Sequence, residues 1–274
     1  MLLFSIFPIL SLVAFIVVAS TKIRVTSGRI GAGFILWISY TALSGRLMSA
    51  LGTLDSRSFW LLVELLPVIA VALFLRSERT ASLGGASQTW RNVVNTAKSM
   101  VLEVWVLPIL MLIVVAYYLV GLVANISLPQ TMDDSLTAYL ARAGFWITSG
   151  SINFFETSSY NFPLVSYPAL PTLSTVRWIV LTGTDHTAAL DQWLATLVSA
   201  TLVYAIGRRI RLSAGVSAVI AMLWLLTPVT LLQSQMVLND MVAMVAILTA
   251  ILLASHLLHR LQMKNFKLYI MVLN

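Results

Sequence analysis

The sequence predicts an all-α polytopic membrane protein with about seven or eight transmembrane helices. Of its 274 residues, 59% are hydrophobic and only 10% are charged, whereas soluble domains carry about 25% charged residues. The mean hydropathy is +0.92. The apolar residues also fall in runs of about 20, the length that a helix needs to cross the hydrocarbon core. These three observations exclude the class of ordinary soluble domains.

Seven stretches have the length and composition of membrane spans, and an eighth is expected to begin at Leu268. The seven are expected at residues 2–20, 30–51, 59–75, 101–124, 188–206, 214–234 and 237–258. The second is the weakest because it carries Arg46, and the third is short and contains Glu64 and Pro67. The first stretch has no basic residue before it and no small-residue cleavage site, so we expect a retained span rather than a cleaved signal peptide.

The basic residues predict the orientation of these spans. One side of the membrane receives 13 of the 17 lysines and arginines: Lys22, Arg24, Arg29, Arg76, Arg79, Arg91, Lys98, Arg208, Arg209, Arg211, Arg260, Lys264 and Lys267. The other side receives Arg46, Arg57, Arg142 and Arg177. Since cytoplasmic loops are enriched in basic residues, the N-terminus and the loop at 125–187 are expected outside.

The spans divide the chain into three parts. Residues 1–75 form an N-terminal three-span unit, 76–100 a cytoplasmic connection with a flexible break at Gly84-Gly85, and 101–274 a transmembrane core with the outer loop. The net charge of +7 is spread over short clusters between apolar runs, as membrane topology requires. We therefore expect membrane lipid as a partner and no nucleic acid. The absence of cysteine excludes disulfides and thiolate chemistry.

The outer loop carries most of the chemistry. Residues 133–149 have apolar side chains at helical spacing, which predicts an amphipathic helix along the membrane surface. Asp133 and Asp134 lie in its first turn. Ionised groups beside a membrane span are hard to explain by packing, so this pair is a candidate for chemistry. The alternative is that the two carboxylates cap the helix and interact with its dipole.

A stretch dense in aromatics and proline follows. Tyr160, Phe162 and Tyr167 can supply stacking faces for a sugar or anchor the chain at headgroup depth, and both interpretations stay open. The prolines of this stretch oppose a regular helix. We expect Trp178 and Trp193 to belong to the aromatic belt of the membrane interface.

The order of these parts resembles the GT-C glycosyltransferases, in particular the protein-mannosyltransferase-like and aminoarabinose-transferase-like branches. An acidic pair follows a span, a surface helix with Tyr139 and Arg142 comes next, and a tyrosine- and proline-rich stretch precedes the following span. Residues 233–240 are similar to the family's short outer turn with its second acidic residue. The similarity covers about residues 101–260. It implies a GT-C-like fold, and we expect the chain to be an N-terminal portion or a reduced homologue of such an enzyme.

The resemblance also implies an activity and a site. The chain would transfer a sugar from a polyprenyl-phosphate carrier to an acceptor at the outer face of a bacterial cytoplasmic membrane. Asp133 or Asp134, with Asp133 favoured, would be the general base, and the other would orient it or help to hold a divalent cation. The expected substrate-binding residues are Tyr139, Arg142, Tyr160, Tyr167, Arg177, Gln235 and Asp240.

Each of these assignments has a structural alternative. The two arginines would bind the leaving phosphate, or their side chains reach the lipid headgroups without a catalytic role. Asp240 or Asn239 can be a helix N-cap. For the whole chain, the alternative is a non-catalytic subunit that uses a GT-C-like scaffold together with additional membrane subunits. A transporter is disfavoured by the scarcity of mid-membrane charges.

Overall fold

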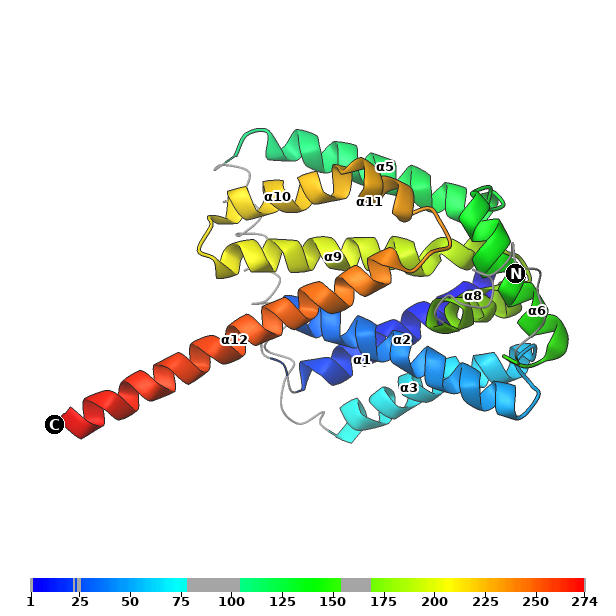
Figure 1. Ribbon diagram of the computed structural model, residues 1–274, viewed down its shortest axis with the longest axis horizontal. Coiled ribbons are helices and arrows are strands. Elements are labelled where there is room, and N and C mark those ends of the chain that lie inside the picture. The colour runs from blue at the N-terminus through cyan, green and yellow to red at the C-terminus, as the bar shows by residue number, and fades with distance from the viewer. Residues whose placement is uncertain (1, 22, 24–25, 78–103, 154–168, 274) are drawn as a thin grey trace.

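The computed structural model describes residues 2–21, 23, 26–77, 104–153 and 169–273, and these residues contain helices but no strand (Figure 1). The elements are η1 (Leu2–Ser5), α1 (Ile6–Ser20), α2 (Thr26–Ala50), α3 (Arg57–Ser77), α5 (Leu107–Ser127), η2 (Ser135–Leu140), α6 (Ala141–Ser149), α8 (Ala169–Thr182), η4 (His186–Ala189), α9 (Leu190–Arg209), α10 (Ala214–Leu226), α11 (Pro228–Gln233) and α12 (Asp240–Leu273). The all-α class and the membrane-protein class are as the sequence predicts.

Five helical segments are long and apolar enough to cross a membrane: Leu3–Ser20, Arg57–Arg76, Leu107–Ser127, His186–Arg209 and Asp240–Leu258. They correspond to five of the seven expected spans. The protein is therefore an integral membrane protein. Its full number of spans, with α2 and α10 included, stays a prediction.

Helix α2 has 25 residues and packs against several other helices of the bundle. It contacts α1, α8, α9 and α12, and its glycines make these approaches possible. A Cβ atom added at Gly33 would lie 2.6 Å from the Cα atom of Ile16, and one at Gly45 would lie 2.8 Å from the Leu173 side chain. Small residues at helix contacts are typical of membrane bundles.

Three boundaries differ from the expectation. The stretch at 214–234 is two helices, α10 and α11, because Pro228 lacks an N–H group and restricts Thr227 before it. Leu268 lies inside α12, so the expected eighth span is not a separate helix. The expected outer loop contains the 14-residue helix α8, which tolerates Pro171 because this residue lies in its first turn.

The helices run in alternating directions and create two unlike ends. Figure 1 shows the N-terminus and α6 at one end, which we call the acidic end, and the turn before α12 contacts the segment of the acidic pair. The α9–α10 turn with Arg208, Arg209 and Arg211 lies at the opposite, basic end, and α12 extends beyond the bundle there. This separation agrees with the predicted alternation of the loops. Which end faces outward stays a prediction.

Candidate functional site at the acidic end

The segment that carries the acidic pair is helical, as predicted. Asp133 and Asp134 open the run, a π-helix follows over Ser135–Leu140, and α6 continues over Ala141–Ser149. Tyr139 and Ala143 of the expected apolar face are buried, whereas Leu136 remains exposed. A π-helix is rare and is frequent at functional sites. The orientation of the 133–149 helix relative to the membrane plane stays a prediction.

Both carboxylates of the pair are exposed. Asp134 has helical backbone angles and makes no capping hydrogen bond with its side chain, so direct capping does not explain it. An interaction with the helix dipole would leave the oxygens of Asp134 available, because it needs no hydrogen bond to them. Among the described residues, no cation lies within ion-pair distance of Asp133 or Asp134. The pair is therefore free to accept a proton or a ligand.

The acidic segment packs against the turn before α12. The Ser135 hydroxyl accepts a hydrogen bond from the backbone N–H of Val237 at 3.1 Å, and the Tyr139 hydroxyl donates to Oδ1 of Asn239 at 3.2 Å. Ala138 and Tyr139 also share a hydrophobic cluster with Val237. The chain thus brings the segment after α5 and the beginning of α12 together, and Tyr139 lies against the residue that precedes Asp240.

Asp240 is exposed at the first position of α12. The free amides of this helix start are bound from another helix: Oε1 of Gln192 in α9 accepts hydrogen bonds from Met241 N at 3.1 Å and Val242 N at 3.2 Å. Gln192 is almost completely buried. Neither amide needs the carboxylate of Asp240 or the amide group of Asn239, so the N-cap alternative for these two residues loses its basis.

The three aspartates do not form a ready ion centre. Among the described residues, no group of three or more His, Cys, Asp or Glu side chains is close enough to hold a metal. Oδ1 of Asp185 lies 3.9 Å from Nε2 of His186, and no third His, Cys, Asp or Glu among the described residues joins them. Mg²⁺ is usually bound by one or two carboxylates, with substrate phosphates and water as the other ligands.

Gln235 is half-buried and points toward α5. Its Nε2 atom donates to the Tyr117 hydroxyl at 2.9 Å, and the adjacent Ser234 carbonyl accepts from Nδ2 of Asn125 at 3.2 Å. These contacts fasten the turn after α11 to α5. A direct role for Gln235 in substrate binding stays a prediction, while its structural role is visible.

Arg142 is buried and does not lie at the surface as expected. Its Nε atom donates to Oγ1 of Thr172 in α8 at 2.9 Å, and its Nη2 atom contacts the same oxygen. The guanidinium also lies 5.1 Å from the centre of the Trp146 ring and 5.9 Å from that of Tyr139. Burial lowers the pKa of Arg142 from its ordinary value. The buried position contradicts the headgroup contact, and a role of Arg142 in substrate binding stays a prediction.

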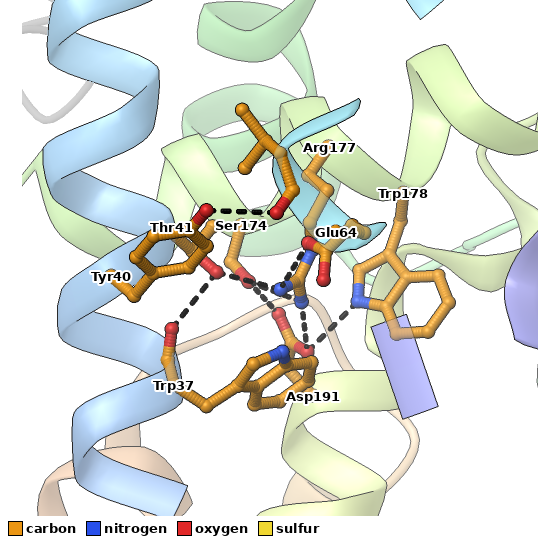
Figure 2. Close-up of polar contacts among 9 residues, drawn as sticks. Trp37, Tyr40, Thr41, Glu64, Ser174, Arg177, Trp178 and Asp191 are labelled. Atoms are coloured by element: carbon orange, nitrogen blue, oxygen red, sulfur yellow. Dashed lines mark hydrogen bonds and ion pairs between the residues drawn. The ribbon is translucent and has the colours of Figure 1, made fainter. Parts of the chain in front are cut away.

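Arg177 is also fully buried and not an outer-loop residue (Figure 2). Its Nη2 atom lies 2.8 Å from Oδ1 of Asp191, and its Nη1 atom lies 3.3 Å from Oε1 of Glu64. Nη1 also donates to Oγ1 of Thr41 at 2.7 Å. These four side chains come from α8, α9, α3 and α2. We call Glu64, Arg177 and Asp191 the buried ion cluster. Arg177 is not available to a phosphate at the surface.

Tryptophans enclose the buried ion cluster. The Cζ atom of Arg177 lies 4.2 Å from the centre of the Trp37 ring and 5.1 Å from that of Trp178. Trp178 donates from Nε1 to Oδ1 of Asp191 at 2.8 Å and is fully buried, so it does not belong to an interfacial belt. Glu64 and Asp191 are not among the expected site residues. The signal that could have found Glu64 is its isolation in the apolar stretch 59–75.

Tyr160 and Tyr167 lie outside the described residues. Comparison of the chain with protein-family models, with curated proteins and with solved structures finds no match.

Proposed function

We propose that this protein is a membrane glycosyltransferase of the GT-C type, which moves a sugar from a polyprenyl-phosphate carrier to an acceptor at the acidic end. The observation that carries the proposal is the pair of free carboxylates at the start of a π-helix, packed against the turn that bears a third exposed carboxylate. We further propose that this end faces outward from a bacterial cytoplasmic membrane.

The chemistry assigns a role to each group. The acceptor hydroxyl attacks the anomeric carbon, its proton passes to a carboxylate that acts as general base, and the bond to the lipid phosphate breaks. Asp133 is the proposed base, and Asp134 orients it or helps to hold a divalent cation. Carboxylates also stabilise the oxocarbenium-like charge of glycosyl transfer. Tyr139 lies in the same segment as the pair, Asp240 lies across the contact, and both are proposed to bind the substrate.

The leaving phosphate needs a positive charge. Arg142 and Arg177 are both held inside the protein, which favours a divalent cation held by Asp134 for this purpose. When bound, such an ion would supply positive charge for the leaving phosphate. The proposed partners are thus membrane lipid, the polyprenyl-phosphate sugar and a divalent cation.

The experiment is a transfer assay with the full chain in liposomes that contain radiolabelled polyprenyl-phosphate sugars. We expect release of the sugar with Mg²⁺ or Mn²⁺ and at least about tenfold less release in a chelator, since the ion contributes several kcal/mol of charge stabilisation. Turnover that is unchanged by the chelator would remove the ion from the proposal.

A second candidate is a non-catalytic subunit of a larger membrane complex. The internal use of both arginines favours it, because they are the two arginines of the 125–187 segment that carries the acidic pair, and a phosphate site without them is weaker. Absence of transfer with any tested carrier, with and without divalent cations, would support this candidate instead.

A further inference from the structure

The buried ion cluster carries an unequal number of charges. It contains two carboxyl groups and one guanidinium, and the side chains of Glu64 and Arg177 have no exposed surface. With both carboxyls ionised the cluster would hold one net negative charge inside the bundle. An uncompensated charge in a membrane interior costs several kcal/mol. A positive ligand is therefore required at this place.

The two carboxyl groups differ in their hydrogen-bond donors. Asp191 accepts from Arg177 Nη2 at 2.8 Å and Trp178 Nε1 at 2.8 Å, and its second oxygen accepts from Ser174 Oγ. Three donors of this kind stabilise the carboxylate form. Asp191 thus pairs with Arg177 and satisfies its charge.

Glu64 has far fewer partners. Oε1 faces Arg177 Nη1 at 3.3 Å, but that nitrogen makes a shorter contact of 2.7 Å with Thr41. Oε2 is buried and has no hydrogen-bond partner among the described residues, and Figure 2 shows it without a dashed contact. Such a group is expensive as a carboxylate, whereas as a carboxylic acid it needs only one acceptor.

The acceptor is within the same packing contact. Ser11 of α1 faces Glu64, is fully buried, and its hydroxyl has no other partner among the described residues. The remaining titratable groups that face Glu64 are Tyr40 from α2, Arg177 from α8 and Asp191 from α9. Tyr40 already donates to the Val63 carbonyl at 2.8 Å. None of these groups supplies the missing positive charge.

We propose that the buried ion cluster binds one proton, carried on Oε2 of Glu64, and that this proton is needed for α3 to pack against α1, α2 and α8. The site lies about 10 Å along α3 from its beginning at Arg57, below the surface of the acidic end. The proposal does not depend on glycosyl transfer.

The first test is the infrared spectrum of the full chain in lipid nanodiscs at pH 7. The expected result is a carbonyl band of a protonated carboxylic acid that shifts in D₂O, disappears in Glu64→Gln and persists in Asp55→Asn, an exposed control at the same end. A wild-type spectrum without the band, or a band that survives in Glu64→Gln, overturns the proposal. Glu64→Gln must fold, since the amide has the charge and shape of the protonated acid; a variant that cannot fold also overturns it.

The second test separates a proton from a small metal ion and uses the thermal midpoint. Because the folded chain holds a proton that Glu64 lacks when the chain is unfolded at neutral pH, folding takes up a proton, and wild-type stability falls as pH rises above the ordinary range of a glutamate. The midpoint of Glu64→Gln should fall less over the same rise in pH. The wild-type midpoint should be equal in sodium chloride and choline chloride at the same ionic strength. A midpoint several degrees higher in sodium identifies a cation site and contradicts the proton.

Discussion

The chain places its carboxyl groups in two contrasting environments. Asp133, Asp134 and Asp240 are exposed at the acidic end, and no cation among the described residues lies within ion-pair distance of them. Glu64 and Asp191 are buried about an arginine between four helices. The carboxylate oxygens of the first set make no ion pair with the described residues, so these side chains contribute little to the stability of the fold. The second set is enclosed by the helices and contacts Arg177.

This difference changes which residues can act on a substrate. A charge that is buried and paired contributes to stability and is costly to remove, whereas an exposed and unpaired carboxylate can be replaced with little effect on folding. Arg142 and Arg177 fall in the buried class, although their positions in the sequence suggest surface residues. The predictions below separate the two classes, beginning with the largest effect.

The arrangement of the two ends predicts an all-or-none labelling result. Because the chain lacks cysteine, Ser151→Cys at the acidic end and Ser213→Cys at the basic end can each be the sole thiol. In intact cells an impermeant thiol reagent should label Ser151→Cys and not Ser213→Cys. Labelling of Ser213→Cys alone would place the basic end outside and contradict the proposed location of the site.

Loss of Arg177 should have the largest effect on stability. Arg177→Met leaves the Asp191 carboxylate buried without its cation, which costs about 3–5 kcal/mol. Thermal unfolding in nanodiscs measures this loss. Arg46→Met is the matched control, because Arg46 is exposed and should change stability by about 0.5 kcal/mol or less. Equal midpoints for the two variants would show that the buried ion cluster does not hold the helices together.

Gln192 should have a smaller and local effect. Gln192→Leu removes two hydrogen bonds at the beginning of α12 and should cost about 1–3 kcal/mol. Hydrogen exchange should become faster at the amides of Met241 and Val242. Gln233→Leu is the control, since Oε1 of Gln233 has no partner among the described residues. Unchanged exchange at both amides in Gln192→Leu would show that Gln192 does not fix the position of Asp240.

Apolar length and hydrophobic spacing predict much of the fold. The five long spans and the helix at 133–149 arise from these local patterns. The patterns fail where a local feature competes with them, as at Pro228, which separates α10 from α11. They also fail for α8, because a helix that is buried among others lacks the outward-facing apolar stripe of a membrane span.

The site is less predictable because its contacts join distant parts of the chain. The Glu64–Arg177 pair spans 113 positions and the Tyr139–Asn239 hydrogen bond spans 100, so no spacing rule connects them. The sequence does show that Glu64 is an acid in an apolar stretch, and an acid in such a stretch indicates a buried polar partner. It also shows the acidic pair, whose exposure agrees with a chemical role but whose activity stays a prediction.

The most direct test of the account is the turnover of Asp133→Asn in the liposome transfer assay. The substitution keeps the size of the side chain and removes the basic oxygen, so turnover should fall at least about 100-fold. The thermal midpoint should stay that of the wild type, because the exposed carboxylate has no described partner. Since Asn satisfies a helix start about as well as Asp, wild-type turnover in both Asp133→Asn and Asp134→Asn would contradict the catalytic role of the acidic pair.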